Sequence, residues 1–390
     1  MRKKKSTRRV LPTLKNPSRF KNKRVLIRLA LNVPIKNNIV SDTYRITQTL
    51  PTLRFLRKAG AKMIAVSHLG SDGSATLVPV AEYLSQFFSV TFLPDENHRE
   101  TLARVGALKP GTLAVVENIR RYVGEERNLP ALVKELAELG DIFVNEDFPS
   151  AHRAHASVVG LPKLLPSYVG FNFAKEVEHL SLAFTPRHPF VFVLGGAKFS
   201  TKVPLLKKFL RMADTIFING ALANTFFKFL GYEVGQSLVD HDTSSVGEFL
   251  KNKKIILPRD VVVRGPRGTR TVSPINIMPD ETILDSGPFS MTDIESKIQK
   301  AKMILWNGPL GKYEEGFTQA TERLATIIAQ AGKKNNAETI VGGGDTVAAI
   351  DKLNLFKKFT WVSTGGGAML DFLAKGTLPG IEAVLKGKRK

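Results

Sequence analysis

The stretch TIVGGGDTVAA, residues Thr339–Ala349, decides how we interpret the fold. Its first three residues are typical of a buried strand, three glycines follow, and Asp345-Thr346 open a segment of helical composition. Glycine has no Cβ atom, so the backbone can approach a ligand closely and adopt positive φ. A helix that begins here directs unpaired N–H groups and the positive end of its dipole at the turn, which favours phosphate. Asp345 adds a carboxylate suited to a Mg²⁺ ion that keeps waters and phosphate oxygens as its other ligands.

Two further glycine turns occur in the second half of the chain, in FVFVLGGAK (residues 190–198) and FTWVSTGGGA (residues 359–368). Strands of one parallel sheet carry their loops at a common edge, so we expect the three turns to converge on one ligand. The alternative is three unrelated helix starts that use glycine for close packing. We prefer the phosphate interpretation because Lys198 and Asp345 supply the two charges that polyphosphate–metal chemistry needs.

The composition excludes several classes of protein. A chain of 390 residues is long enough for two domains of ordinary size. It contains no cysteine, which excludes disulfides, thiolate metal sites and a cysteine nucleophile. No apolar run reaches the length of a membrane span, and no apolar segment of a secretory signal follows the basic N-terminus. We therefore expect a cytoplasmic protein.

The net charge of +22 is concentrated at the two ends. Met1–Arg28 holds twelve Lys and Arg residues and no acidic residue, and Lys386–Lys390 adds four more. Such a cluster can bind nucleic acid or an anionic membrane. The alternative, which we prefer, is a solvated and flexible lead over residues 1–20, because no nucleic-acid-binding motif accompanies the charge.

Apolar strand patterns alternate with helical patterns along the whole chain. In the first half the predicted strands are Arg24–Leu31, Lys62–Val66, Val90–Leu93, Leu113–Val116 and Asp141–Val144. In the second half they are Phe190–Leu194, Thr215–Asn219, Lys254–Leu257, Met303–Trp306, Thr339–Val341 and Phe359–Val362. This alternation predicts right-handed βαβ units, and hence an α/β fold of two Rossmann-like, doubly wound parallel-sheet domains.

The predicted domain boundaries follow from this alternation. The first domain covers residues 21–168, a hinge helix 169–184, the second domain 185–375, and a tail, 376–390, returns to the first domain. Pro258–Thr292, rich in Pro, Gly and charge, is predicted to be an irregular β excursion.

Ligands of such sheets bind beyond the carboxyl ends of the strands. In the first half these ends carry mostly basic residues: Asn32, Arg45, His68, Arg120, Arg121, His152 and Arg153. A basic cleft that faces a phosphate-binding cleft is what phosphoryl transfer between a small anion and a nucleotide requires. The alternatives are a surface ion pair for each arginine and a hydrogen-bonded loop histidine for His68. Metal ligation by His152 and His155 is disfavoured because their loop offers no third ligand.

An ordered series of segments resembles the phosphoglycerate kinase family from about Lys21 to the end. The segments are KRVLIRLALNVP, DTYRI, SHLG, VENIRR, AHRAHAS, LGGAKFSTK, LANTF, ILPRDVVV, LWNGPLG, VGGGDTVAA and VSTGGGAML. The resemblance implies two hinged lobes and a reversible transfer of the acyl phosphate of 1,3-bisphosphoglycerate to Mg·ADP, without a covalent enzyme intermediate. The implied partners are ATP/ADP and 3-phosphoglycerate/1,3-bisphosphoglycerate, the implied cofactor is Mg²⁺, and family members are usually monomers.

The resemblance also implies site residues. Those of the nucleotide site are Gly195, Gly196, Lys198, Lys202, Gly220, Asn307, Pro309, Glu314, Gly343, Gly344, Asp345 and Thr346. Among them, Lys202 is expected to hold the α- and β-phosphates, Glu314 the ribose hydroxyls and Asp345 the metal. The implied catalytic residues are Arg45, Lys198, Gly366 and Gly367, and those that hold the phosphoglycerate are Asn32, His68, Arg120 and Arg153. Arginine suits this work because its planar fork binds phosphate and carboxylate through two hydrogen bonds.

The chain departs from the family pattern mainly on the acid side. Ala30 stands where the family has an aspartate that accepts the substrate hydroxyl, and Ser71 stands where it has an arginine after His-Leu-Gly. The segment NEDFPS, residues 145–150, replaces a pattern closer to Asn-Asp-Ala-Phe-Gly-Thr, and Asn219-Gly220-Ala221 replaces three glycines. Each lost charged hydrogen bond predicts an acid affinity weaker by about one to two orders of magnitude. The alternative function is a catalytically weakened or inactive paralogue that binds nucleotide and serves as a regulatory or nucleic-acid-binding protein.

Overall fold

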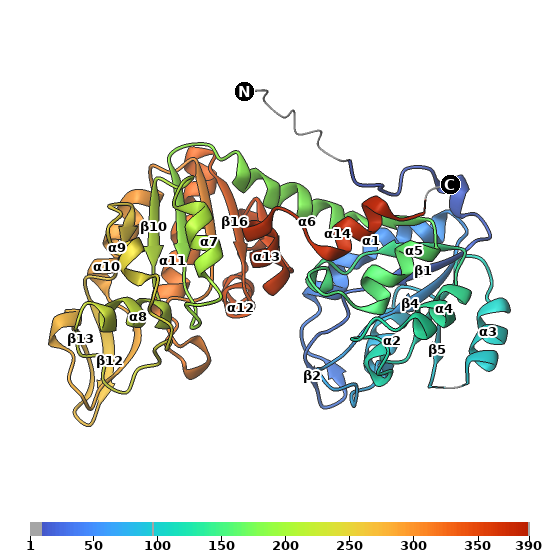
Figure 1. Ribbon diagram of the computed structural model, residues 1–390, viewed down its shortest axis with the longest axis horizontal. Coiled ribbons are helices and arrows are strands. Elements are labelled where there is room, and N and C mark those ends of the chain that lie inside the picture. Colours follow the sequence, from blue (N-terminus) through green and yellow to red (C-terminus); the bar gives the residue numbers. More distant parts are fainter. Residues whose placement is uncertain (1–9, 96, 389–390) are drawn as a thin grey trace. The chain divides into compact units, whose positions relative to one another are not determined.

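The computed structural model describes residues 10–95 and 97–388, which form two compact units (Figure 1). The first unit holds the described residues up to Glu178 and those from Thr377 onward, and the second is His179–Gly376. Within the predicted basic lead, residues 1–9 lie outside the described part of the chain. Residues 13–20 pack on the first unit: Thr13 bridges to Val169, and Phe20 is 1% exposed.

The first unit is built on one sheet in which all neighbouring strands are parallel. Its strand order is β5 (Val90–Leu93), β6 (Leu113–Val116), β4 (Lys62–Val66), β1 (Arg24–Arg28), β7 (Ile142–Asn145) and β8 (Ser167–Val169). Its main helices are α1 (Tyr44–Lys58), α2 (Val78–Ser85), α3 (His98–Gly106) and α4 (Pro130–Glu138). Shorter elements are η1 (Pro17–Phe20), β2 (Ile35–Lys36), β3 (Ile39–Val40), η2 (Ile119–Arg121), η3 (Phe148–Ser150), η4 (Ala156–Gly160) and α5 (Leu161–Leu164).

Both faces of this sheet are buried, each under its own helices. Val25 and Ile27 of β1 belong to one apolar cluster together with residues of α1 and α2. Leu26, between them in the sequence, belongs to a second cluster with residues of α3 and α4. Successive side chains of a strand point to opposite faces, so burial on both faces explains why the strands are apolar without interruption.

The second unit repeats this architecture with different strands. Its parallel sheet has the order β11 (Ile255–Ile256), β10 (Thr215–Ile218), β9 (Phe190–Leu194), β15 (Met303–Asn307), β16 (Glu338–Gly342) and β17 (Trp361–Ser363). Its helices are α7 (Val203–Phe209), α8 (Ala221–Phe229), α9 (Val246–Leu250), α10 (Pro288–Ile298), α11 (Gln319–Asn335), α12 (Gly344–Lys352) and α13 (Gly367–Lys375). Single turns are η5 (Leu182–Phe184), η6 (Pro274–Asn276), η7 (Tyr313–Glu315) and η8 (Phe356–Lys358). These two doubly wound sheets confirm the predicted fold class.

The predicted β excursion is an antiparallel sheet with β12 (Val261–Gly265) between β13 (Gly268–Val272) and β14 (Thr282–Ser286). Its predicted end at Thr292 is wrong, because α10 begins at Pro288. The Asp260 carboxylate accepts hydrogen bonds from the backbone N–H groups of Phe289 (3.0 Å) and Ser290 (2.7 Å). A cap supplied by a residue about thirty positions away leaves no local signal in the sequence.

The chain passes from the first unit to the second within α6 (Phe171–Ser181). The buried Glu146 accepts hydrogen bonds from Asn172 N (3.1 Å) and Phe173 N (3.0 Å), so a carboxylate caps the start of this helix. After α13 the chain returns to the first unit as α14 (Pro379–Lys386), where Gly380 N donates to Ala151 O at 2.8 Å. Within the described residues, no helix has both the length and the apolar character needed to cross a membrane.

Candidate active site

The cations predicted for the acid substrate lie at the carboxyl edge of the first sheet. His68 follows β4, Arg120 lies in η2 after β6, and Arg153 follows β7 and η3. Arg45 lies in the first turn of α1. The charges of Arg120 and Arg153 both contribute to lowering the pKa of His68, as expected for neighbouring cations.

A chain of hydrogen bonds through Gly70 connects three of the predicted residues. Arg45 Nη1 donates to Asn32 O at 2.8 Å, and Asn32 Oδ1 accepts from Gly70 N at 3.0 Å. Arg120 Nη1 in turn donates to Gly70 O (2.9 Å) and to Ser71 O (3.0 Å). Ser71 thus contributes a backbone carbonyl that orients Arg120 and no cation of its own. The structure therefore brings Arg45, Asn32 and Arg120 to one loop.

His68 is held as a neutral imidazole. Burial, and then the neighbouring Arg28 guanidinium, lower its pKa to about 2. Arg28 Nη2 lies 2.9 Å from His68 Nδ1, and a guanidinium can only donate, so Nδ1 must be the acceptor. The ring proton then resides on Nε2, which makes His68 a neutral hydrogen-bond donor rather than a base or a cation.

Two guanidinium nitrogens of the acid side are enclosed without a hydrogen-bond acceptor. They are Arg153 Nη1 and Arg120 Nε, and neither finds a hydrogen bond among the described residues. Arg120 Nε lies 3.4 Å from a carboxylate oxygen of Glu126, whose side chain is 56% exposed. A buried donor without an acceptor raises the free energy of the folded protein, and a bound anion would supply the missing acceptors. This cluster is therefore suited to an anion. Arg121, by contrast, pairs with Glu117 at 3.3 Å.

On the nucleotide side, three helices begin directly after a glycine at the carboxyl edge of the second sheet. Gly220, Gly343 and Gly366 are the N-cap residues of α8, α12 and α13. Gly343 has φ 115°, a conformation that a side chain would strain. The Gly195-Gly196 turn differs from these three, because α7 begins only at Val203. Glycine is required at position 195 because the backbone there lies close to the backbone at Pro309, and a Cβ atom would collide with Pro309 O.

Hydrogen bonds of Lys202 and Asn307 join the loop after β9 to the last residues of β15 and β16. Lys202 Nζ donates to Asn307 Oδ1 at 2.9 Å, and Asn307 Nδ2 donates to Gly342 O at 3.0 Å. Lys202 is 9% exposed, and burial lowers the pKa of its ammonium group to about 8. No carboxylate of the described chain forms an ion pair with it. An enclosed ammonium group with a neutral partner is suited to phosphate oxygens.

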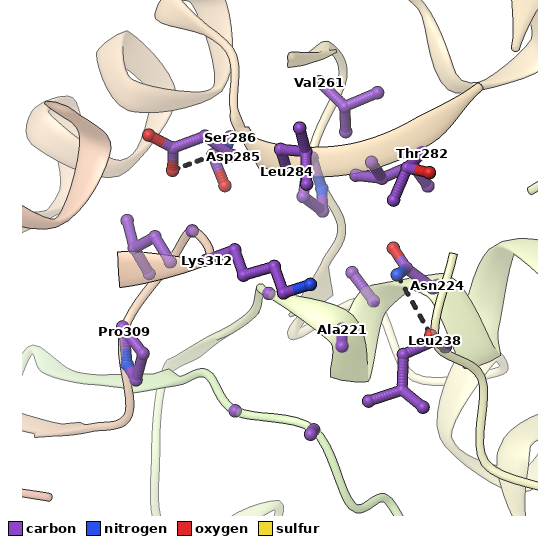
Figure 2. Close-up of a pocket in the computed structure, with 18 of the residues that line it drawn as sticks. Ala221, Asn224, Leu238, Val261, Thr282, Leu284, Asp285, Ser286, Pro309 and Lys312 are labelled. Carbon is purple, nitrogen blue, oxygen red and sulfur yellow. Dashed lines mark hydrogen bonds between the residues drawn. The ribbon is translucent and has the colours of Figure 1, made fainter. Parts of the chain in front are cut away.

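A pocket of about 400 Å³ opens beside these loops (Figure 2). Five of the predicted nucleotide residues line it: Gly196, Gly220, Pro309, Glu314 and Asp345. Figure 2 shows apolar side chains in the lining, such as Leu238 and Leu284. The side chain of Lys312 extends in the direction of Asn224 (Figure 2). Asn224 Nδ2 donates to Leu238 O at 3.1 Å. The Oδ1 atom of Asn224 is enclosed and accepts no hydrogen bond within the described chain. A mostly apolar cavity with a few fixed polar groups suits a planar base and its sugar.

The residues at the start of α12 fit a metal bound mainly through phosphate. Burial and the Glu314 carboxylate raise the pKa of Asp345, so a cation at this point would relieve unfavourable charge. Thr346 Oγ1 is enclosed and has no hydrogen-bond partner among the described residues. Those residues contain no cluster of three or more His, Cys, Asp or Glu that could hold a metal. A single carboxylate fits Mg²⁺, which usually keeps waters and substrate phosphates as its remaining ligands.

Other predicted residues lie at the same sheet edge but outside this pocket. Gly344 and Gly367 are the first residues of α12 and α13. Lys198 is exposed in the loop after β9, next to the pocket residue Ala197. The roles assigned to these residues stay predictions.

The sequence interpretation missed two groups. Arg28 lies in the apolar run RVLIRLAL, and an arginine within a buried strand was itself a signal of a required partner. The pocket residues Asn224, Leu238, Thr282, Leu284 and Lys312 were also missed. They come from segments far apart in sequence, and only the quoted segment LANTF pointed to one of them.

Comparisons with known proteins agree on one family. The family model for phosphoglycerate kinase matches residues 15–376. Phosphoglycerate kinase of Thermus thermophilus is 43% identical over 385 residues, which cover 94% of this chain and 98% of that protein. The enzyme of Borrelia turicatae is 40% identical over 386 residues, 94% of this chain and 97% of that one. Among solved structures, phosphoglycerate kinase of Coxiella burnetii aligns with TM-score 0.79 at 37% identity, covering 94% of this chain and 96% of that chain. That of Pyrococcus horikoshii aligns with TM-score 0.83 at 29% identity, with the same coverage. These matches confirm the predicted resemblance: the chain belongs to the phosphoglycerate kinase family of glycolytic phosphotransferases.

Proposed function

We propose that the chain reversibly transfers a phosphoryl group from the acyl phosphate of 1,3-bisphosphoglycerate to Mg·ADP, giving 3-phosphoglycerate and ATP. The observation that carries this proposal is a pair of enclosed guanidinium nitrogens, Arg120 Nε and Arg153 Nη1, that make no hydrogen bond within the described residues, where Arg120 Nε has only the half-exposed Glu126 carboxylate 3.4 Å away. Anionic groups of the acid substrate supply such acceptors. A cytoplasmic, monomeric enzyme is the form we expect.

Within the proposed reaction each side chain has a role set by its surroundings. Arg120 and Arg153 bind anionic groups of the acid, and His68 donates from Nε2. Arg45 places positive charge beside the transferring phosphoryl group, because its guanidinium is oriented by one bond to Asn32 O and forms no ion pair among the described residues. Lys202 and the first-turn N–H groups of α12 bind the nucleotide phosphates, and the N–H groups at the start of α13 bind the transferring phosphoryl group. Asp345 would hold Mg²⁺, which when bound would neutralise negative charge on the phosphates.

A coupled assay with 3-phosphoglycerate and Mg·ATP tests the activity. We expect turnover with a KM for the acid about one to two orders of magnitude above that of a family member with Asp and Arg at these positions, because Ala30 and Ser71 lack charged groups. Ser71→Arg is the matched gain-of-function variant and is expected to lower this KM about tenfold. Folded protein that binds ADP in calorimetry but shows no turnover at saturating acid would falsify the proposed activity.

The affinity for ADP is expected to depend on the protonation of Lys202. The cationic form binds phosphate, and the pKa of about 8 means that this form is lost as the pH rises above 8. Between pH 8 and 9.5 the Kd for ADP should therefore increase about tenfold. Lys202→Arg remains charged and should give a flat profile over this range, whereas Lys207→Arg, on the exposed side of α7, should keep the wild-type slope. Calorimetric titrations at constant ionic strength measure this, and a flat wild-type profile would contradict the role of Lys202.

A further inference from the structure

A buried ion pair links the ends of two neighbouring strands in the first unit. Arg28 Nη1 lies 2.9 Å from Asp147 Oδ2, and both side chains are 1% exposed. Asp147 Oδ1 accepts a hydrogen bond from Ser150 N at 3.1 Å, and Asp147 N donates to Asn145 Oδ1 at 3.0 Å. Oδ2 is enclosed and accepts no hydrogen bond within the described chain, and its ion-pair partner there is Arg28.

The register of the sheet relates Asp147 to Ala30. β1 and β7 are parallel, and Arg28 is paired with Asn145. The ladder continues one step further, because Glu146 N donates to Arg28 O at 2.9 Å. Ala30 and Asp147 each lie two residues beyond the paired positions, at the ends of adjacent strands. This edge therefore has a methyl group on the β1 side and a carboxylate on the β7 side.

Arg28 connects Asp147 to the acid site through hydrogen bonds. Its Nε donates to Ser157 Oγ at 2.9 Å, and its Nη2 donates to His68 Nδ1 at 2.9 Å. The second bond keeps the ring proton of His68 on Nε2. A guanidinium without its carboxylate would be a buried, uncompensated charge, and it would be drawn toward other acceptors.

We propose that Asp147 is a positioning residue of the acid site, which holds Arg28 in place so that Arg28 fixes the His68 ring as an Nε2–H donor toward the substrate. In this arrangement β7 supplies the carboxylate at an edge where β1 carries Ala30. The inference rests on the proposed function for its effect on substrate, and on the structure alone for its effect on His68.

The direction in which Asp147→Asn changes the affinity for 3-phosphoglycerate distinguishes a positioning role from a purely electrostatic one. Asp147→Asn removes a negative charge beside an anion site, so long-range electrostatics alone would tighten the binding of 3-phosphoglycerate. Loss of positioning predicts the opposite. Glu126→Gln is the matched control, because it removes the same charge from the rim of the same cluster, where the side chain is 56% exposed.

Calorimetry with 3-phosphoglycerate on the full chain is the first measurement. We expect Asp147→Asn to raise the Kd and the KM for the acid about tenfold with a smaller change in kcat, while Glu126→Gln leaves the Kd unchanged or lowers it. Nitrogen-15 NMR of the histidine rings is the second measurement. The wild-type protein should show His68 as the Nε2–H tautomer, and Asp147→Asn should show a mixture of tautomers.

The possible outcomes are distinct. If Asp147→Asn binds the acid as tightly as the wild type and keeps a single His68 tautomer, the positioning role is overturned. If the wild type neither binds nor converts the acid, the proposed function fails, and the tautomer measurement still decides the role of Asp147. If Asp147→Asn does not fold, the double variant Ala30→Asp/Asp147→Asn restores a carboxylate from the neighbouring strand. That variant is expected to fold and bind the acid within about threefold of wild type, and folded protein that does not bind would contradict the proposal.

Discussion

Replacing Arg45 with alanine is expected to reduce kcat about 10³-fold, which corresponds to about 4 kcal/mol of transition-state stabilisation. Arg45 lies in the first turn of α1, and its one described side-chain bond, from Nη1 to Asn32 O at 2.8 Å, orients the guanidinium without neutralising it. Its remaining N–H groups can donate hydrogen bonds to the transferring phosphoryl oxygens, on which negative charge develops. Because that charge develops mainly in the transition state, kcat should fall more than the KM rises.

The matched control for Arg45 is Arg54→Ala on the same helix. Arg54 is exposed, so its loss changes the net charge by the same amount and leaves the helix intact. It should change kcat by less than twofold. Steady-state kinetics in the direction of ATP synthesis measure both variants. An Arg45→Ala enzyme with wild-type kcat would show that positive charge near the transferring group comes from elsewhere.

The fold was predictable because its strands are buried on both faces. A strand such as β9, FVFVL, is apolar at every position, so it is visible in the sequence without knowledge of its neighbours. The boundary that was wrongly predicted, between the β excursion and α10, depends on a distant residue. The start of α10 is set by the Asp260 carboxylate.

The candidate site was predictable to the extent that it lies directly at strand ends. Asn32 and His68 closely follow strands and Asn307 ends one, and the geometry of parallel sheets then brings each of them to the carboxyl edge of the sheet in its own unit. Side chains that act through partners could not be predicted in this way. The pairing of Arg28 with Asp147 joins residues 119 positions apart in the sequence, and neither has a local pattern that identifies the other.

The same contrast applies to two departures from the family pattern on the acid side, whose relation to each other is not visible in the sequence. Counted position by position, Ala30 is a lost carboxylate and the segment NEDFPS is an unrelated change. The register of β1 and β7 places the two changes at the ends of adjacent strands. If Asp147 has the positioning role proposed above, the absence of a carboxylate at Ala30 and its presence at Asp147 together amount to a redistribution of charge within one cluster.

Replacing Asp345 with asparagine is expected to lower kcat/KM for Mg·ATP about 10²-fold. Asp345 lies in the first turn of α12 and lines the pocket together with Glu314, whose carboxylate contributes to the raised pKa of Asp345. The two charges repel each other in the metal-free protein. Asp345→Asn removes this repulsion, so the affinity for metal-free ADP should stay equal or increase, whereas the gain in affinity on adding Mg²⁺ should be lost.

This opposite change in two affinities distinguishes a metal ligand from a structural residue. Asp351→Asn, at an exposed position of the same helix, removes an equal charge and should leave both affinities unchanged. Calorimetric titration of ADP with and without Mg²⁺ gives both values for each variant. If Asp345→Asn weakened both affinities equally, its role would be to stabilise the start of α12, and the metal would have to be held by the phosphates and other residues of this edge.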